Sequence, residues 1–397
     1  TDGDGKADVR RVVLGGFGNG DSHQTINSFV WSPGGELYFC HGDGCESRVE
    51  TPWGASSLFN AGFYRFRPRR LQLRPFLGGH MGPGNPWGIG FDRWGQVFSI
   101  DGAGGVNWLS PGLVSTSHVR RIQEIGEPGG YCGMDYLDGH GLPESLRGSF
   151  VIGDFKANRV KRFSVKPEGA GYKLEWKEPL LHSQHRNFRP VDVKVGPDGA
   201  VYVVDWYNSI IDHGEVDFYH PQRDKSHGRI WRVTAKGRPV HDWQPLSGEP
   251  PTRLLEHLRS RERWALRQAT RLLAEMHVET LMPALETWIE NLDPNDPQYE
   301  QLLLRAIGLY ESHEVVAPEL LDKLVHASDP RGRAYAARVV GNWGERLAEP
   351  LALLEQLVND PNGRVRLEAV VACSYIRRPR AIEIAAMAID NPRDPHI

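Results

Sequence analysis

One phrase recurs in the first 240 residues: an aromatic or apolar lead, a glycine turn, and a run of alternating apolar residues. Its copies occupy residues 31–39, 91–101, 146–154 and 195–205. Their turn glycines are Gly35, Gly95, Gly148 and Gly199, which lie 60, 53 and 51 residues apart. Each apolar run has the length of a β-strand, and such turns suit hairpins. Several short strands in each of these periods predict the blades of a β-propeller.

A β-sandwich with irregular hairpins is the alternative, but the phrase keeps one phase along the chain, which favours repeated blades. Roughly four blades fit between residues 9 and 235, and an open ring would leave sheet edges exposed. The chain also opens at Thr1, without a methionine and inside what looks like a motif. We therefore expect a mature or trimmed fragment of a six-bladed type, with its N-terminal blades missing or supplied by another segment.

The composition changes after a Pro/Gly-rich linker at 236–252, and residues 250–397 are rich in Leu, Ala, Glu and Arg. Asp329-Pro330 recurs 31 residues later as Asp360-Pro361, and again as Asn391-Pro392. Asp before Pro caps and starts a helix. Helix pairs at such a period predict a HEAT-like α–α solenoid, whose usual work is to dock a partner. A helical domain that only packs against the propeller is the alternative.

The expected fold is therefore multidomain β + α, with a propeller at 1–240 and HEAT-like repeats at 250–397. The formal net charge is −3 with both signs interspersed, which excludes the basic footprint of a nucleic-acid binder. No run of 18 apolar residues exists to span a membrane, and no signal peptide is visible. Cysteines are few, and they make no disulfide framework, zinc spacing or c-type haem motif. They are Cys40, Cys45, Cys132 and Cys373, of which the first two could form one bridge.

Acidic residues alternate with glycine at the start of the chain, where Asp2, Asp4 and Asp8 surround Gly3 and Gly5. Carboxylates at alternate positions, with glycine at the bend, suit a small loop that wraps calcium in oxygen ligands. The motif lacks the downstream glutamate of an EF-hand, and a solvated acidic turn is the alternative. These three aspartates are the candidate calcium ligands.

Polar residues gather in the last blade and in loops that should converge at one mouth of the propeller axis. The candidate catalytic residues are His23, Arg189, Asp205, His213 and His227. A histidine beside a carboxylate can take a proton from a sugar hydroxyl. The candidate substrate-binding residues are Asp101, Tyr207, Asn208 and Arg223, with Trp53 and Trp87 as surfaces that could stack on sugar rings. Each lone Asp or His could instead cap a turn or join two blades.

Four stretches resemble proteins that carry a membrane-bound dehydrogenase domain and are abundant in planctomycetes and verrucomicrobia. These stretches are 1–9, 85–88 with 91–96, 189–199, and 205–208 leading to 223–231. The resemblance covers about residues 1–240 and implies a glucose/sorbosone dehydrogenase-like propeller. In such proteins HEAT repeats follow, and a cytochrome c module often comes next. A periplasmic or extracellular location is implied as well.

The propeller is also similar to soluble glucose/sorbosone dehydrogenases, which hold pyrroloquinoline quinone and calcium. Residues 37–43 resemble their Gly-Asp loop, which implies a substrate-binding role for Asp43. Residues 85–90 resemble their Arg-Asn-Pro-Gln-Gly segment, which implies the same role for Asn85. Gly84 stands where those enzymes have the arginine expected to face the quinone, and Trp87 replaces their glutamine.

The resemblance and the polar residues together favour an extracytoplasmic sugar or polyol oxidoreductase that passes electrons to a cytochrome c. The alternative is a non-catalytic carbohydrate-binding or scaffold protein, in which the propeller binds a glycan and the helical array docks a protein. A third hypothesis is a metal-dependent hydrolase or lyase that uses Asp205, His213 and His227. The contents of the axial mouth should distinguish these functions.

Overall fold

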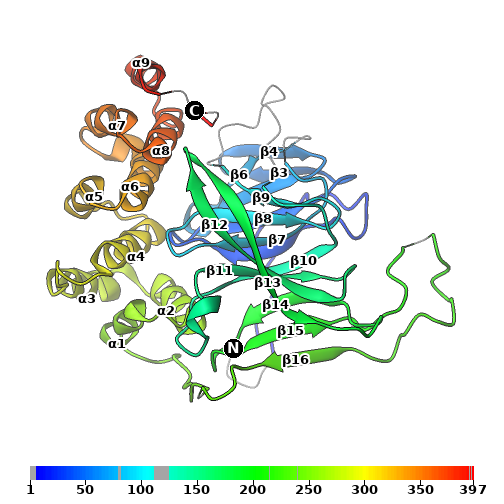
Figure 1. Ribbon diagram of the computed structural model, residues 1–397. Coiled ribbons are helices and arrows are strands. Elements are labelled where there is room, and N and C mark those ends of the chain that lie inside the picture. The colour runs from blue at the N-terminus through cyan, green and yellow to red at the C-terminus, as the bar shows by residue number, and fades with distance from the viewer. Residues whose placement is uncertain are drawn as a thin grey trace.

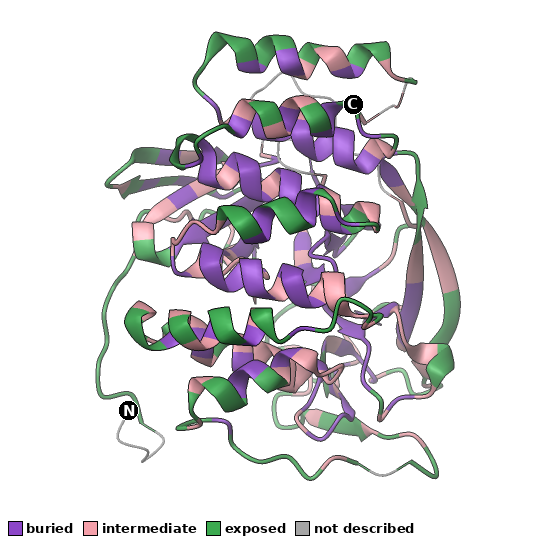
Figure 2. Ribbon diagram, turned by 90° about the vertical axis from the view of Figure 1, so that its left-hand side faces the viewer, coloured by how far each residue is buried: buried purple, intermediate pink, exposed green. Residues whose placement is uncertain are grey.

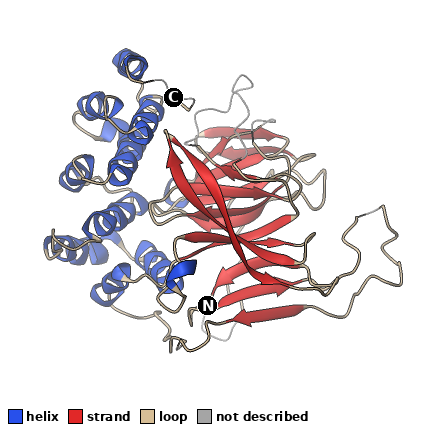
Figure 3. Cartoon of the chain, viewed as in Figure 1, coloured by secondary structure: helices blue, strands red, loops and turns tan. Residues whose placement is uncertain are grey.

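The computed structural model describes residues 6–78, 82–110, 125–213, 215–238, 240–392, 394 and 396–397. Its first half is a series of antiparallel β-sheets, and its second half is an array of helices along one edge of those sheets (Figures 1 and 3). Within the described ranges, none of the helices combines the length and the apolar character that crossing a membrane requires. The four cysteines are thiols, and none of them is paired in a disulfide.

Four of the sheets are meanders, with the strand orders β1-β2-β5-β6, β7-β8-β9, β10-β11-β12-β13 and β14-β15-β16. The strands of the first two are β1 (Asn27–Trp31), β2 (Leu37–His41), β5 (Gly62–Arg67), β6 (Gln72–Phe76), β7 (Pro86–Phe91), β8 (Val97–Asp101) and β9 (Val106–Trp108). The strands of the others are β10 (Tyr131–Leu137), β11 (Ser149–Asp154), β12 (Arg159–Glu168), β13 (Gly171–His182), β14 (Pro190–Val195), β15 (Val201–Asp205) and β16 (Arg229–Val233). A separate hairpin of β3 (Glu46–Thr51) and β4 (Gly54–Phe59) is inserted in the first sheet.

The first strand of each meander contacts the first strand of the next: β1 contacts β7, β7 contacts β10, and β10 contacts β14. Consecutive antiparallel sheets whose first strands lie innermost around one axis are the blades of a propeller. The prediction of a β-propeller is therefore confirmed, and the described residues form four blades.

The turn glycines of the recurring phrase join the first and second strands of successive blades. They are Gly35, Gly95, Gly148 and Gly199, with φ angles of 74°, 75°, 74° and 77°. Because other residues rarely adopt this backbone conformation, glycine is required at each turn. These turns face the helices: a Cβ added at Gly35 would meet Ser312, and one added at Gly95 would meet Tyr335. The repeated phrase thus marks the end of the propeller that the helices cover.

Apolar side chains fill the spaces between successive blades. Ile89 of β7 packs into the core between the first two blades. Val201 and Val203 of β15 belong to the core between the last two described blades, as alternate residues on one strand face should. The outer face of the first blade packs against the N-terminal segment, where the Phe17 ring lies edge-on to Phe39 at 5.6 Å.

The helices form two rows. Their bounds are α1 (Pro251–Glu256), α2 (Arg263–Glu275), α3 (Val278–Glu290), α4 (Tyr299–Ser312), α5 (Pro318–Val325), α6 (Pro330–Trp343), α7 (Pro350–Val358), α8 (Gly363–Cys373) and α9 (Pro379–Ala386). The inner row of α2, α4, α6 and α8 faces the propeller, and α3, α5 and α7 lie outside it (Figure 1). Figure 2 shows exposed residues on the outer row and buried residues behind it. Stacked helix pairs of this kind make an α–α solenoid.

The repeated acidic residues act as caps in one repeat but not in the next. Asp329 accepts a hydrogen bond from the Arg331 amide at 2.9 Å and begins α6, as expected. In the next repeat Asn362 is the cap instead, and α8 begins after it. Asp360 accepts hydrogen bonds from the Asn362 amide at 2.8 Å and from the Arg333 guanidinium at 2.7 Å, but α8 begins only after Asn362, so the expectation that Asp360 itself caps the helix was wrong. Its carboxylate links two successive repeats.

Arginines of the inner helices hold the helical array against the blade turns. Arg338 of α6 donates to the Gly95 carbonyl at 2.9 Å, and Arg364 of α8 donates to the Gln96 side chain at 2.8 Å. Trp94, in the same turn, belongs to the hydrophobic core of the helices. Because the two halves share core residues as well as hydrogen bonds, the inner helices have a fixed position relative to the propeller axis.

Candidate functional site

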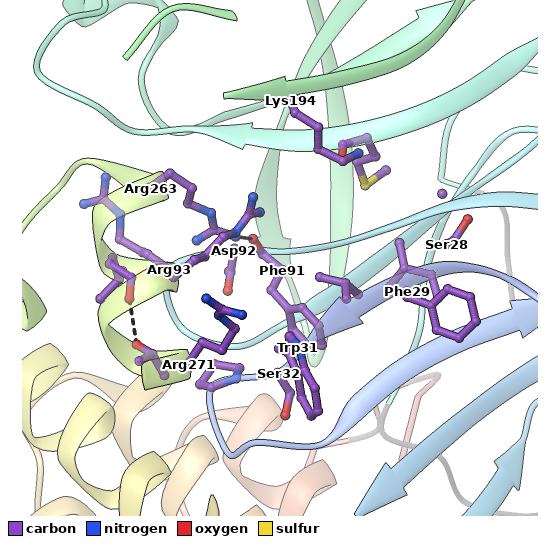
Figure 4. Close-up of a pocket in the computed structure, with 18 of the residues that line it drawn as sticks. Ser28, Phe29, Trp31, Ser32, Phe91, Asp92, Arg93, Lys194, Arg263 and Arg271 are labelled. Carbon is purple, nitrogen blue, oxygen red and sulfur yellow. Dashed lines mark hydrogen bonds between the residues drawn. The ribbon is translucent and has the colours of Figure 1, made fainter. Parts of the chain in front are cut away.

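A pocket of about 680 Å³ lies on the propeller axis. The first strands β1, β7, β10 and β14 contribute one side of it, and α2 with the nearby end of α4 contributes the other (Figure 4). Turns that join the first and second strands also line it, which places it toward the end that the helices cover. Small-molecule sites commonly enclose roughly 300–1,000 Å³, so this pocket has the size of a ligand site.

Aromatic side chains line the propeller side of the pocket. Phe29 and Trp31 of β1 share one strand face and remain 55% and 49% exposed. Phe29 stacks on the ring of Phe39 at 5.2 Å, which fixes its orientation. Phe91 and Met134 add apolar surface from the next two blades. Exposed aromatic rings held in a pocket offer flat surfaces on which the apolar face of a ligand can lie.

Arginines line the end of the pocket nearest the helices, and we call them the arginine cluster. Its members are Arg93, Arg261, Arg263, Arg267, Arg271 and Arg305. Three of them, Arg263, Arg267 and Arg271, are four residues apart on α2, so one face of this helix presents all three. Figure 4 shows Arg263, Arg93 and Arg271 beside α2, with Phe29 at the far side of the pocket.

Two buried carboxylates of the third blade pair with members of the cluster. Asp135 accepts two hydrogen bonds from Arg267, at 2.5 and 3.1 Å, and Asp138 is bonded by Arg93. Burial raises the pKa of Asp135, but the Arg267 and Arg263 guanidiniums more than offset this effect and hold it below its ordinary value. Burial raises the pKa of Asp138 despite its arginine neighbours.

Arg263 is buried and Arg305 is partly buried, and within the described part of the chain neither lies within ion-pair distance of a carboxylate. Arg263 donates to the Phe91 carbonyl, and Arg305 donates to the Leu258 carbonyl. Burial and neighbouring guanidiniums lower the pKa of each to about 10. Positive charge is therefore concentrated in a poorly solvated part of the pocket.

Two of the aspartates predicted for the mouth of the propeller (the end of the blades opposite the helices) hold turns. Asp101 at the end of β8 accepts hydrogen bonds from the amides of Asn85, at 3.1 Å, and Ala103, at 2.8 Å. Asp205 at the end of β15 accepts from the amides of Arg189, at 2.8 Å, and of the residue two positions after itself. Each carboxylate fastens the end of a second strand to the segment before the first strand of its blade.

Three residues of the last blade that were predicted as site residues donate hydrogen bonds to loop carbonyls instead. Arg189 donates to the carbonyls of Asn208, at 2.9 Å, and Phe155, at 2.7 Å. The amide group of Asn208 donates to the Asp224 carbonyl at 3.0 Å. Arg223 donates to several carbonyls of its own loop between β15 and β16. These polar groups therefore stabilise the long loop at the mouth.

The predicted histidines form two separate groups at the mouth. The His23 ring lies 4.1 Å from the His213 ring, which brings the loop before β1 next to the loop after β15. His23 Nδ1 also lies 2.8 Å from the Asp21 carboxylate. His227 Nδ1 lies 2.8 Å from the carboxylate of Asp224. The structure thus provides two exposed His–Asp pairs, neither of which lines the axial pocket.

Trp87, which was predicted from the sequence as a surface for a sugar ring, lines the axial pocket. Its indole N–H donates to Asn85 Oδ1, which also accepts from Gln24 Nε2 at 2.6 Å. Asp43 lies nearby: its amide donates to the Gly84 carbonyl at 2.9 Å, and a Cβ added at Gly84 would lie 2.6 Å from its carboxylate.

The remaining predicted residues lie outside the pocket. Trp53 is at the tip of the β3–β4 hairpin, where Arg70 stacks on its ring at 4.6 Å. Tyr207 lies under the Arg229 guanidinium at 3.6 Å. Asp2 and Asp4 lie outside the described residues, whereas Asp8 is described. The described ranges contain no group of three His, Cys, Asp or Glu that could hold a metal ion.

The arginine cluster was missed from the sequence. Its clearest signal is the spacing of Arg263, Arg267 and Arg271 at intervals of four, which puts three like charges on one helix face. A solvated helix face is the ordinary interpretation of such spacing. Only the docking of α2 against the first strands, seen in the structure, converts that face into the wall of a pocket.

Comparisons with solved structures find low similarity. A glucose dehydrogenase shares 17% identity at a TM-score of 0.35, and the match covers 53% of this chain and 64% of that one. The soluble aldose sugar dehydrogenase of Escherichia coli shares 15% at a TM-score of 0.29, with 47% and 80% covered. Virginiamycin B lyase of Staphylococcus aureus shares 10% at 0.29, with 54% and 71% covered. This chain thus spans less than two thirds of the length of that glucose dehydrogenase.

A search of curated proteins found no match. The family model described as HEAT repeats matches residues 317–397, which confirms the repeats predicted from the sequence. A second family model, described as a domain of unknown function (DUF7133), matches residues 1–107 and 106–237, and so spans the whole propeller. The chain therefore belongs to the DUF7133 family and carries HEAT repeats after its propeller.

Proposed function

We propose that this chain is a carbohydrate-binding propeller whose axial pocket takes a sugar or polyol. The pocket itself carries the proposal, because it combines the exposed rings of Phe29 and Trp31 with convergent guanidinium donors in a volume of about 680 Å³. Sugars present an apolar ring face and a rim of hydroxyl groups. A site with flat aromatic surfaces on one side and hydrogen-bond donors on the other is complementary to both.

The helical array completes the proposed binding site. Its α2 helix supplies the pocket wall opposite β1, so the propeller alone would leave that wall open. The outer row of helices carries exposed residues along its length (Figure 2). An α–α solenoid is a common docking surface for another protein, and we propose this role for the outer row.

Two tryptophans with similar exposure provide a matched test of the binding site. Trp31 lines the pocket and is 49% exposed, whereas Trp53 on the β3–β4 hairpin is 55% exposed and lies outside the pocket. Neither side chain is a core residue, so both variants should fold. Glycan-array screening followed by calorimetry on the best ligand should show roughly tenfold weaker binding for Trp31→Ala, since stacked aromatic anchors contribute on the order of 1–2 kcal/mol. Trp53→Ala should bind like the parent.

The opposite pattern, with Trp53→Ala impaired and Trp31→Ala unaffected, would place the site on the hairpin and contradict the proposal. Failure to bind any glycan on the array would contradict it as well. Circular dichroism of both variants controls for folding.

A sugar or polyol dehydrogenase that passes electrons to a cytochrome c outside the cytoplasm is the second candidate. One observation favours it: His23 lies beside both Asp21 and His213 at the mouth, and a histidine next to a carboxylate can accept a hydroxyl proton. Oxidation of an alcohol also releases two electrons, so this function requires a bound redox cofactor.

The assay for this candidate supplies the purified protein with pyrroloquinoline quinone and calcium, a dye acceptor and a panel of aldoses and polyols. Turnover that disappears in His23→Gln, with the fold intact, would support a dehydrogenase. Absence of both turnover and quinone uptake would contradict it and leave the binding function.

A further inference from the structure

The arginine cluster carries more positive charge than the nearby carboxylates neutralise. Six arginines line the pocket, whereas Asp135 pairs with Arg267 and Asp138 pairs with Arg93. Asp92 also lines the pocket, but its carboxylate accepts hydrogen bonds from two amides of its own turn. Lys194 adds a further cation, which pairs with Asp192 at 2.6 Å.

Arg263 is the most constrained member of the cluster. It is only 8% exposed, and one of its donors bonds the Phe91 carbonyl. Its Nε atom is buried, and among the described residues no hydrogen-bond partner lies near it. Leaving a buried donor of a cation without a partner costs more than leaving a neutral one. Burial, together with the charge of Arg267, accordingly lowers the pKa of Arg263 to about 10.

The α2 helix holds like charges together on the face that lines the pocket. Arg263, Arg267 and Arg271 are at positions i, i+4 and i+8, and like charges at this spacing repel each other and destabilise a helix. Arg271 has its carboxylate neighbour Glu275 at 3.7 Å, a loose contact that leaves its guanidinium available to a ligand. In Figure 4 its side chain extends toward Trp31. A bound anion would offset this repulsion.

We propose that the ligand of the axial pocket is an acidic saccharide. Its carboxylate or sulfate binds among Arg263, Arg271 and Arg93, and its sugar ring lies against Phe29 and Trp31. The proposal rests on the carbohydrate-binding function proposed above and names its substrate class. Guanidinium pairs carboxylate and sulfate oxygens through two parallel hydrogen bonds, which suits both a uronate and a sulfate ester.

The test measures binding of three disaccharides to the full chain by calorimetry: digalacturonate, its carboxyl-reduced neutral counterpart, and a galactose disaccharide with a sulfate ester. We expect at least one acidic ligand to bind about tenfold or more tightly than the neutral one, since charge-assisted hydrogen bonds are about twice as strong as neutral ones. Its affinity should fall as salt is added. The acidic ligand that binds identifies the source of the anion.

Arg271→Gln removes a pocket guanidinium whose side chain is half exposed and should leave the fold intact. This variant should bind the acidic ligand about tenfold more weakly, and the neutral ligand as the parent does. Arg253→Gln on α1, where the arginine is 76% exposed and outside the pocket, is the matched control and should change nothing. The more buried Arg263→Gln should lose more affinity, with thermal unfolding as the check on its fold.

Two results distinguish failure of the anion proposal from failure of the carbohydrate-binding function. If the neutral disaccharide binds as tightly as both acidic ones and binding still depends on Trp31, the anion proposal is overturned while the carbohydrate-binding function stands. If none of the three binds, both proposals fail. Equal affinity of Arg271→Gln and the parent for an acidic ligand would also overturn the anion proposal, because the ligand would then not contact the cluster.

Discussion

Replacing Arg267 by methionine removes a guanidinium that joins α2 to the third blade. Its partner, the Asp135 carboxylate, has no exposed side-chain surface and accepts bonds from the guanidinium at 2.5 and 3.1 Å. Breaking a fully buried pair costs about 3–5 kcal/mol. Arg267 is 37% exposed, which screens the interaction, and the amides of Val195 and Tyr136 still bond the carboxylate, so we expect roughly 2 kcal/mol for Arg267→Met.

The pH dependence of this loss follows from the lowered pKa of Asp135. A carboxyl whose pKa is lower in the folded state than in the unfolded state stabilises the fold above the unfolded value, which is near 4, and this contribution disappears as the pH falls through the folded value. In Arg267→Met, burial remains while the main opposing charge is gone, so the pKa of Asp135 rises. The difference between variant and parent should therefore be largest at pH 7 and should shrink below pH 4.

Urea unfolding at pH 7 and at pH 3, followed by circular dichroism, measures both effects. Arg271→Met is the matched control, because it removes another arginine from the same face of α2 that has no buried carboxylate partner. A change of less than about 0.5 kcal/mol at pH 7, which is typical of a neutral surface substitution, would refute the reasoning. So would a loss for Arg267→Met that is equal at the two pH values.

Three further predictions concern the interface, a buried histidine and the mouth. Gly308→Ala should destabilise the fold despite the higher helix propensity of alanine, because its Cβ would lie 2.2 Å from the Pro33 carbonyl oxygen; thermal unfolding checks this. Burial lowers the pKa of His41 to about 4, so stability should fall by up to roughly 3 kcal/mol between pH 6.5 and pH 4, and His41→Gln should remove most of this slope in urea titrations. Trp87→Ala should weaken saccharide binding in calorimetry because its ring lines the pocket, and unchanged affinity would exclude contact with the ligand.

The fold was largely predictable because its strongest signals are local. A turn that needs a positive φ requires glycine, so Gly35 and its three counterparts reveal the blade period directly. The helical repeats were visible for a similar reason, since Asp329 caps α6 through a bond to an amide two residues away. These interactions extend over a few residues, and a single sequence contains all that is needed to expect them.

The axial pocket was not predictable, because it depends on how distant segments dock. The apolar residues Ala269 and Leu273 of α2 are buried. The arginines on another face of the same helix line a pocket only because α2 packs near β1 and β7. Conversely, Asp205 has the position expected of a site residue, but its carboxylate is occupied by two amides and the Trp231 indole of its own blade. Its position at the end of a strand did not reveal that its carboxylate stabilises a turn.

The central claim is that the axial pocket between β1 and α2 binds the ligand of this protein. A crystal structure of the chain soaked with the acidic disaccharide that binds in calorimetry tests it most directly. The account predicts a sugar ring against Phe29 and Trp31, with its carboxylate or sulfate within hydrogen-bond distance of Arg263 or Arg271. A ligand seated instead beside His23 and His213 at the mouth, with the axial pocket filled by water, would contradict it.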